Sequence, residues 1–160
     1  LIEAAYASTW QGARRKPIRQ VYPNIGDWLD RYYGIDAHIV FADGSFISVQ
    51  EKIRSYKAFR KWKEFTQEYE NHPGMKDGEW FKLGAQVYFY AWANQDETGL
   101  EDWLILDIPA YKNFANKLGG LKGLGDIVSN ERFGTATFCA VAMRQLQPVL
   151  IKSKHLAGYH

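Results

Sequence analysis

The strongest structural signal in the chain is a pair of alternating apolar and polar segments on either side of Asp43-Gly44. The segments cover residues 35–41 and 45–53, and a period of two residues is typical of strands that bury one face. An Asp-Gly pair between two such segments predicts a β-hairpin. We therefore expect a sheet that contains this hairpin.

The length of the hairpin loop decides which side chains share a face. A two-residue turn at Asp43-Gly44 would set Asp36 opposite Glu51 and expose one apolar set. A three-residue loop with Gly44 in the left-handed conformation, or a bulge, places both apolar sets on one face. We expect that arrangement, because exposing several large apolar side chains costs roughly 1.5–3 kcal/mol each. The two sets are Ile35, Ala37, Ile39 and Phe41, and then Ile47, Val49 and Ile53.

The opposite face of the hairpin would then bring together Asp36, Gln50 and Lys52. A carboxylate and an amide carbonyl are oxygen ligands suited to a hard cation, and an ammonium can offset negative charge. The alternative is an exposed strand face on which Asp36 and Lys52 form a surface pair of little energetic value. His38 shares this face, where a structural histidine is favoured over a base. Glu51 is expected on the other side.

Gly34-Ile35-Asp36, followed after thirteen residues by Gln50-Glu51-Lys52, resembles the core of the PD-(D/E)xK nuclease superfamily. The Gln-x-Lys form is similar to Mrr-like restriction enzymes and some Holliday-junction resolvases. The resemblance covers residues from about 25 to 110 and includes Gly78-Glu79-Trp80-Phe81, although Ile35 replaces the usual Pro. It implies an α/β (α+β), restriction-endonuclease-like fold, with a central mixed β-sheet flanked by helices.

The same resemblance implies a metal-dependent DNA endonuclease that is structure-selective or weakly sequence-specific. Asp36 and the side-chain oxygen of Gln50 would bind Mg²⁺ or Mn²⁺, helped by the backbone carbonyl of Glu51. Lys52 would orient the attacking water or offset charge in the transition state. Because Gln50 is neutral, the site should hold a cation more weakly than a pair of acids. Glu3 is the candidate for a compensating carboxylate.

Residues 54–65, directly after Lys52, interleave cations with aromatic side chains. The cations would hold phosphates beside the site, and the aromatic rings would stack on unpaired bases. The alternative is an amphipathic element with its rings packed inward and its cations in water. The cations are Arg54, Lys57, Arg60, Lys61 and Lys63; the rings are Tyr56, Phe59, Trp62 and Phe65.

Two other functions fit the same sequence. A catalytically inactive nuclease-fold module would keep the basic residues for DNA and lack the metal. A small-ligand or carbohydrate-binding domain would use some of the six tryptophans. A net charge of +2 is too small to establish a nucleic-acid partner by itself.

The remaining pattern predicts alternating helices and strands within one domain of 160 residues. Helices are expected over residues 1–11, 24–34 and 109–118, a helical turn over 78–83, and strands over 85–93, 103–108 and 135–143, the last of them central. Residues 64–69 either continue the basic element or form a strand. The Gly-rich residues 119–125 are expected to end a helix. Residues 148–160 are typical of a mobile tail or a dimer arm, so a homodimer is considered as well as DNA.

Cys139, the single cysteine, excludes a disulfide framework and a Cys-rich zinc site. It lies in an apolar run, so we expect a small core residue and a reducing, cytoplasmic setting. No apolar run has the roughly 18 to 20 residues that a membrane span needs, and no leader opens the sequence.

Overall fold

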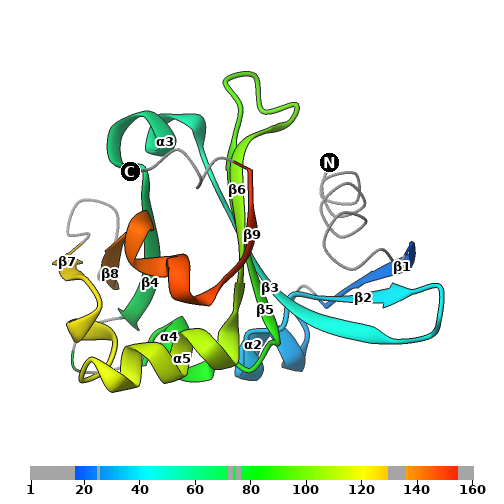
Figure 1. Ribbon diagram of the computed structural model, residues 1–160, viewed down its shortest axis with the longest axis horizontal. Helices are drawn as coiled ribbons and strands as arrows, with labels where there is room; N and C mark the ends of the chain where they lie inside the picture. The colour runs from blue at the N-terminus through cyan, green and yellow to red at the C-terminus, as the bar shows by residue number, and fades with distance from the viewer. Residues whose placement is uncertain (1–16, 25, 72–73, 75–76, 130–135, 155–160) are drawn as a thin grey trace.

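The structure is a computed structural model of the chain, and it describes residues 17–24, 26–71, 74, 77–129 and 136–154. Two β-sheets and several short helices make up this part of the chain (Figure 1). The helix expected over residues 1–11, and with it Glu3, lies outside the described residues. None of the described helices is both long enough and apolar enough to cross a membrane.

The larger sheet has six strands in the order β1-β2-β3-β5-β6-β9. Only β3 and β5 run parallel to each other, and every other neighbouring pair in this sheet is antiparallel. The expected mixed sheet is therefore confirmed. Its strands are β1 (Ile18–Pro23), β2 (Ala37–Phe41), β3 (Phe46–Arg54), β5 (Val87–Ala93), β6 (Leu100–Asp107) and β9 (Leu150–Ser153).

The second sheet is antiparallel and has the strand order β4-β8-β7. Its strands are β4 (Glu64–Asn71), β8 (Ala136–Ala142) and β7 (Asp126–Ser129). Residues 64–69 thus form a strand of their own. The strand expected over residues 135–143 exists as β8 and is central, but in this second sheet. It is not the last strand of the chain, because β9 follows it.

Short helices lie around the sheets, and in Figure 1 α2, α4 and α5 gather at the lower end while α3 lies at the upper end. They are α2 (Trp28–Tyr33), α3 (Tyr56–Trp62), α4 (Glu79–Lys82) and α5 (Ile108–Lys117), with 3₁₀ turns at Leu121–Gly123 and Met143–Val149. Helix α2 begins after Asp27 and not at Asn24, because Oδ1 of Asp27 accepts the first free amide hydrogens of the helix. Trp28 and Tyr32 of this helix are 59% and 71% exposed.

The hairpin has the expected three-residue loop. Ala37 pairs with Val49, and Val40 pairs with Phe46. The amide of Phe41 donates to the carbonyl of Ser45 at 2.8 Å, and Gly44 has a φ of 82°. A left-handed residue at this position shifts the register by one, which brings residues of matching parity together.

Each face of the main sheet packs into its own core. One core contains Ile39, Ile47 and Val49 with residues of β5 and β6, while the other lies between the two sheets around Phe65 and Tyr111. Two residues depart from the expected apolar face. Ile35 precedes β2 and packs against the inter-sheet core, because the turn at Gly34 interrupts the alternation. Ile53 is 42% exposed, because the end of β3 extends beyond its pairing with β2.

The C-terminal strand closes one edge of the main sheet. Leu104 pairs with Ser153, and Leu106 pairs with Leu150. Residues 148–153 are therefore part of the fold, and the expectation of a tail from residue 148 was wrong for them. The opposite edge strand β1 was not predicted, since Ile18–Pro23 has no clear alternation. Cys139 is fully buried and its Sγ donates to the carbonyl of Leu121, in agreement with a core role.

Candidate functional site

A cluster of polar side chains lies on the inter-sheet face of the hairpin. Asp36 stands just before β2, Gln50 and Lys52 lie on β3, and Glu79 opens α4. Just beyond the last pair of the β2–β3 ladder, Ala37 with Val49, Nε2 of Gln50 lies 2.6 Å from Oδ2 of Asp36. Lys52 follows on the same face about 6.6 Å along the strand. The structure thus brings Asp36 into contact with Gln50 and puts Lys52 on the same face of β3 as Gln50.

Gly34 fixes the approach of the chain to this cluster. It ends α2 with a φ of 55°, in the left-handed region where a side chain is disfavoured. A Cβ atom at this position would lie 2.6 Å from Oε1 of Gln50. Glycine is therefore required both by the backbone turn and by the close contact with Gln50.

Asp36 is held rigidly but is poorly stabilised as an anion. Its Oδ2 accepts hydrogen bonds from Nε2 of Gln50 at 2.6 Å and from the amide of Glu51 at 2.7 Å. Burial raises the pKa of Asp36 to about 6, against the lowering effect of the Glu51 amide, and the negative charges of Asp30, Glu51 and Glu79 raise it further. The pocket around this carboxylate is short of positive charge.

Gln50 presents an unsatisfied oxygen in the same place. The residue is 5% exposed, and its Oε1 is buried with no hydrogen-bond partner among the described residues. Its Nε2 faces two oxygens, Oδ2 of Asp36 and the carbonyl of Glu51, the latter at 3.4 Å. If the amide exchanged its nitrogen for its oxygen, three oxygens would converge, an arrangement that only a cation stabilises.

Lys52 is held at the other end of the cluster by Glu79. Its Nζ lies 3.6 Å from Oε2 of Glu79 and 5.4 Å from the ring centre of Phe138 on β8. The same Glu79 oxygen accepts hydrogen bonds from Nε2 of Gln67 at 2.8 Å and from the hydroxyl of Tyr88 at 3.1 Å. Within the described part of the chain no direct hydrogen bond or ion pair joins Lys52 to Asp36. Lys52 is thus neither in the apolar interior nor free to swing away.

The role of Glu79 was missed in the sequence analysis, which noted it only within Gly78-Glu79-Trp80-Phe81. A Cβ on Gly78 would lie 2.6 Å from the carbonyl carbon of Tyr69, so the glycine permits α4 to pack tightly on β4. This packing points Glu79 towards β3. The glycine was a visible signal, but the contact with Lys52 joins segments far apart in the chain.

The candidate metal ligands form a mixed set. In the ranges that the structure describes, no group of three or more His, Cys, Asp or Glu side chains is placed to hold an ion. The oxygens available are the carboxylate of Asp36, Oε1 of Gln50 and the carbonyl of Glu51, with Glu79 beyond Lys52. Such a set of hard oxygen donors suits Mg²⁺ or Mn²⁺ at modest affinity. The side chain of Glu51 alternates to the other face, as expected.

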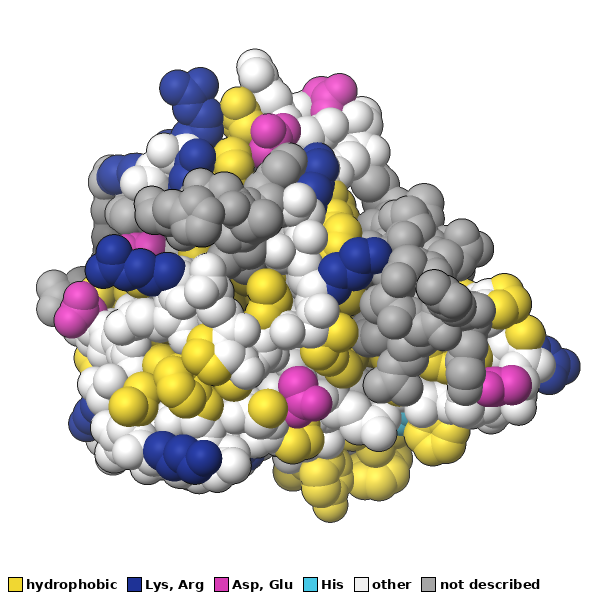
Figure 2. Space-filling view, viewed as in Figure 1, with side chains coloured by type: hydrophobic (Ala, Val, Ile, Leu, Met, Phe, Trp, Pro, Cys, Tyr) yellow, Lys and Arg dark blue, Asp and Glu magenta, His cyan; other side chains and the backbone are white. Residues whose placement is uncertain are grey.

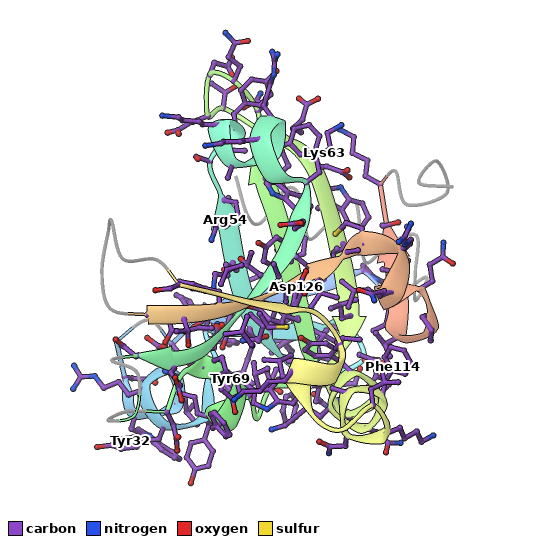
Figure 3. The ribbon with its side chains drawn as sticks, turned by 90° about the vertical axis from the view of Figure 1, so that its left-hand side faces the viewer. Tyr32, Arg54, Lys63, Tyr69, Phe114 and Asp126 are labelled. Atoms are coloured by element: carbon purple, nitrogen blue, oxygen red, sulfur yellow. The ribbon has the colours of Figure 1, made fainter. Side chains whose placement is uncertain are left out.

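The five cations expected to form one DNA-binding patch are distributed over three places. Arg54 donates from Nη1 to Oγ1 of Thr66 on β4 at 3.3 Å, and Nζ of Lys63 lies 4.8 Å from the ring centre of Phe59. Figure 3 shows Arg54 and Lys63 well separated. The other three cations, Lys57, Arg60 and Lys61, line an open pocket.

Two other polar residues near the hairpin have structural contacts. Nδ1 of His38 lies 2.8 Å from Nδ2 of Asn24, and its ring packs against Phe46, which fits the favoured structural role. Oε1 of Gln86 accepts the amide hydrogen of Ser48 at 3.0 Å and so helps to align the chain beside β3. Neither residue contacts the Asp36 cluster.

No protein-family model, curated protein or solved structure matches this chain. The resemblance to PD-(D/E)xK nucleases therefore rests on the motif residues of the sequence alone.

Proposed function

We propose that Asp36, Gln50, Lys52 and Glu79 form the active site of a Mg²⁺- or Mn²⁺-dependent endonuclease of restriction-endonuclease-like fold that hydrolyses phosphodiester bonds in DNA. The observation that carries the proposal is a half-buried carboxylate of raised pKa beside a buried amide whose oxygen has no hydrogen-bond partner among the described residues. Each is unfavourable alone, and one cation at the Asp36 carboxylate would relieve both once the Gln50 amide turned its oxygen towards that carboxylate.

The chain would hold that cation through Asp36, the side-chain oxygen of Gln50 and the backbone carbonyl of Glu51. When bound, the cation supplies a Lewis acid for the phosphate. Asp36 and Gln50 keep their positions because β2 and β3 are paired directly beside them. The ligands are therefore preorganised by the sheet and not by a loop.

Lys52 supplies the positive charge beside these oxygens. Its ammonium would hydrogen-bond to a phosphate oxygen or to the attacking water, and would stabilise charge that develops in the transition state. Glu79 is a positioning residue, since it contacts Lys52 and is itself held by Gln67 and Tyr88. This arrangement fixes the ammonium while leaving part of it accessible.

Cleavage assays on branched, duplex and single-stranded DNA with Mg²⁺ or Mn²⁺ test the proposal. We expect Asp36→Ala and Lys52→Ala each to lower kcat by about 100-fold or more, because both groups act on the reacting phosphate. Asp126→Asn and Lys117→Ala, which alter exposed residues of β7 and α5, should leave the rate unchanged. Equal cleavage by the wild type and both site variants would refute the assignment.

A DNA-binding module without catalysis is the second candidate, favoured by the neutral Gln50 and by the lack of a third carboxylate in the described cluster. Titration with Mn²⁺ separates the two, because saturable binding that disappears in Asp36→Ala supports the enzyme. A carbohydrate-binding role has less support, since Trp80 and Trp92 are buried and cannot stack on a sugar. A cytoplasmic location is part of the proposal, on the ground of the free, buried thiol of Cys139.

A further inference from the structure

An open pocket of about 640 Å³ lies where β3 ends and α3 begins. One wall comes from α3 and the residue before it, and the other from the loop between β5 and β6. Figure 1 shows both at the upper end of the molecule, away from α2, α4 and α5. The pocket is lined by Ser55, Tyr56, Lys57, Arg60, Lys61 and Gln95, together with Glu97. None of these residues belongs to the Asp36 cluster.

The pocket is strongly biased towards an anion. Its lining includes three cations and only one carboxylate, that of Glu97. No described carboxylate forms an ion pair with Lys57 or Arg60, so their charges are available to a ligand. Ser55, Tyr56 and Gln95 add uncharged donors. Figure 2 shows dark-blue side chains gathered at this upper end, over α3. Lysine and arginine beside hydroxyl and amide donors are the usual partners of a phosphate group.

Hydrogen bonds within the loop between β5 and β6 fix the conformation of this wall of the pocket. Oδ1 of Asn94 accepts the amide hydrogen of Gly99 at 2.9 Å, and Oδ1 of Asp96 accepts the Thr98 hydroxyl hydrogen at 2.7 Å. Glu97 has a φ of 56°, in the left-handed region that residues other than glycine rarely adopt. Such a backbone conformation persists only where its surroundings enforce it, so the pocket is preformed.

The pocket and the Asp36 cluster are connected along β3. Lys52 and Arg54 are two positions apart on β3 and so lie on one face of the strand, and both are partly exposed. At about 3.3 Å per residue, Ser55 lies roughly 16 Å beyond Gln50. One strand of duplex DNA advances about 3.4 Å per nucleotide, so this distance corresponds to about five base pairs.

We infer that this pocket binds a backbone phosphate of the substrate DNA about five nucleotides from the bond that is cut. The distance takes its meaning from the proposed nuclease function, on which this inference rests. The enzyme would therefore need DNA that continues for about five nucleotides on one side of the cleavage point. Shorter DNA would reach the Asp36 cluster but leave the pocket empty.

Binding of a duplex of about 20 base pairs to the Asp36→Asn protein, measured by fluorescence anisotropy over a range of salt concentrations, tests the pocket without any cleavage. Adding Lys57→Ala and Arg60→Ala should weaken binding about 10-fold and lower the slope of log K against log salt by about 1–2. The matched control is Lys117→Ala with Arg144→Ala, two exposed cations of α5 and of the 3₁₀ turn Met143–Val149. Unchanged affinity and slope in the pocket variant would overturn the inference.

Inorganic phosphate is the other ligand that would bind the pocket through the same contacts, and a competition experiment distinguishes it from DNA. At constant ionic strength, millimolar inorganic phosphate should leave the difference between the pocket variant and its parent in place. If phosphate abolishes that difference, the pocket is a site for the free ion and the assignment to DNA is wrong.

The length requirement is measured with cleavage-competent protein. The Lys57→Ala, Arg60→Ala variant should have a raised KM on long duplexes, an unchanged kcat, and the wild-type KM on duplexes that end fewer than about five base pairs from the cut. An equal rise in KM at every length would contradict the spacing. An unchanged affinity and salt slope in the pocket variant, with cleavage by the wild type intact, would refute the pocket alone. No cleavage by the wild type, with the difference in binding intact, would refute the nuclease alone.

Discussion

The carboxylate of Asp36 has well-placed hydrogen-bond donors but an environment that disfavours its negative charge. Its two hydrogen bonds at Oδ2 hold the carboxylate in place, yet burial and three neighbouring negative charges raise its pKa from an ordinary 3.8 to about 6. Between about pH 4 and pH 6 the folded protein therefore binds a proton that the unfolded chain has lost. The free energy of unfolding should fall as the pH rises through this window.

Asp36→Asn should remove that dependence, because asparagine keeps a carbonyl oxygen for the Glu51 amide and carries no charge. We expect the free energy of unfolding at about pH 7 to rise by about 1–2 kcal/mol, less than the full pKa shift implies since the side chain is partly solvated. At about pH 4 the variant and the wild type should unfold alike. Urea denaturation across this pH range measures both.

Asp126→Asn is the control, since Asp126 lies exposed on β7 (Figure 3). A site variant that is no more stable than wild type at neutral pH would show that the buried charge costs nothing. Greater stability together with lost cleavage would be typical of a residue kept for function at the expense of stability.

Glu79→Gln tests the positioning of Lys52. Glutamine keeps an oxygen for Gln67 and Tyr88 but loses the ion pair with the ammonium. We expect kcat to fall about 10-fold while KM stays close to the wild-type value, because the lysine acts in the transition state more than in substrate binding. Glu68→Gln, the same change at the next position after Gln67 on β4, should affect neither constant. A change confined to KM would place Glu79 in substrate binding.

At the scale of elements, local patterns predicted the loop and register of the hairpin, and its surroundings only in part. The alternation in residues 35–53 permits one register that buries both apolar sets, and the pairing of Ala37 with Val49 has that register. The strand Ile18–Pro23 escaped prediction, since an edge strand needs no strict alternation. The partner of β8 could not be predicted either, because pairing with β4 depends on contacts between distant segments.

Substitutions at two glycines of the hairpin region distinguish the effect of backbone strain from that of a steric clash. Gly34 and Gly44 both have positive φ values, but a Cβ would meet Gln50 at Gly34 and nothing within 4 Å at Gly44. We expect Gly44→Ala to destabilise the protein by about 1 kcal/mol, and Gly34→Ala by about 2–3 kcal/mol with a loss of cleavage. Thermal unfolding and DNA cleavage measure the two effects. Equal losses of stability with cleavage intact would show that the Gln50 contact is unimportant.

At the scale of the whole molecule, the sequence predicted a mixed sheet with flanking helices but not the second sheet. The candidate site illustrates the same limit. Asp36, Gln50 and Lys52 were predictable because one hairpin carries all three, and strand alternation alone sorts them to one face. Glu79 reaches them from a separate helix, and no local spacing encodes that approach. The inter-sheet position of the site could not be read from a single hairpin.

The parallel pairing of β3 with β5 affects the order in which the residues of the candidate site come together during folding. Parallel neighbours cannot be joined by a tight turn, so the chain must leave the sheet and return, and here that excursion includes α3, β4 and α4. The same excursion contains Glu79 and Gln67. Contacts between such distant segments form late in folding. The ammonium of Lys52 therefore gains its partner only once the excursion is complete, so a partly folded chain has the acid and the amide without a fixed lysine.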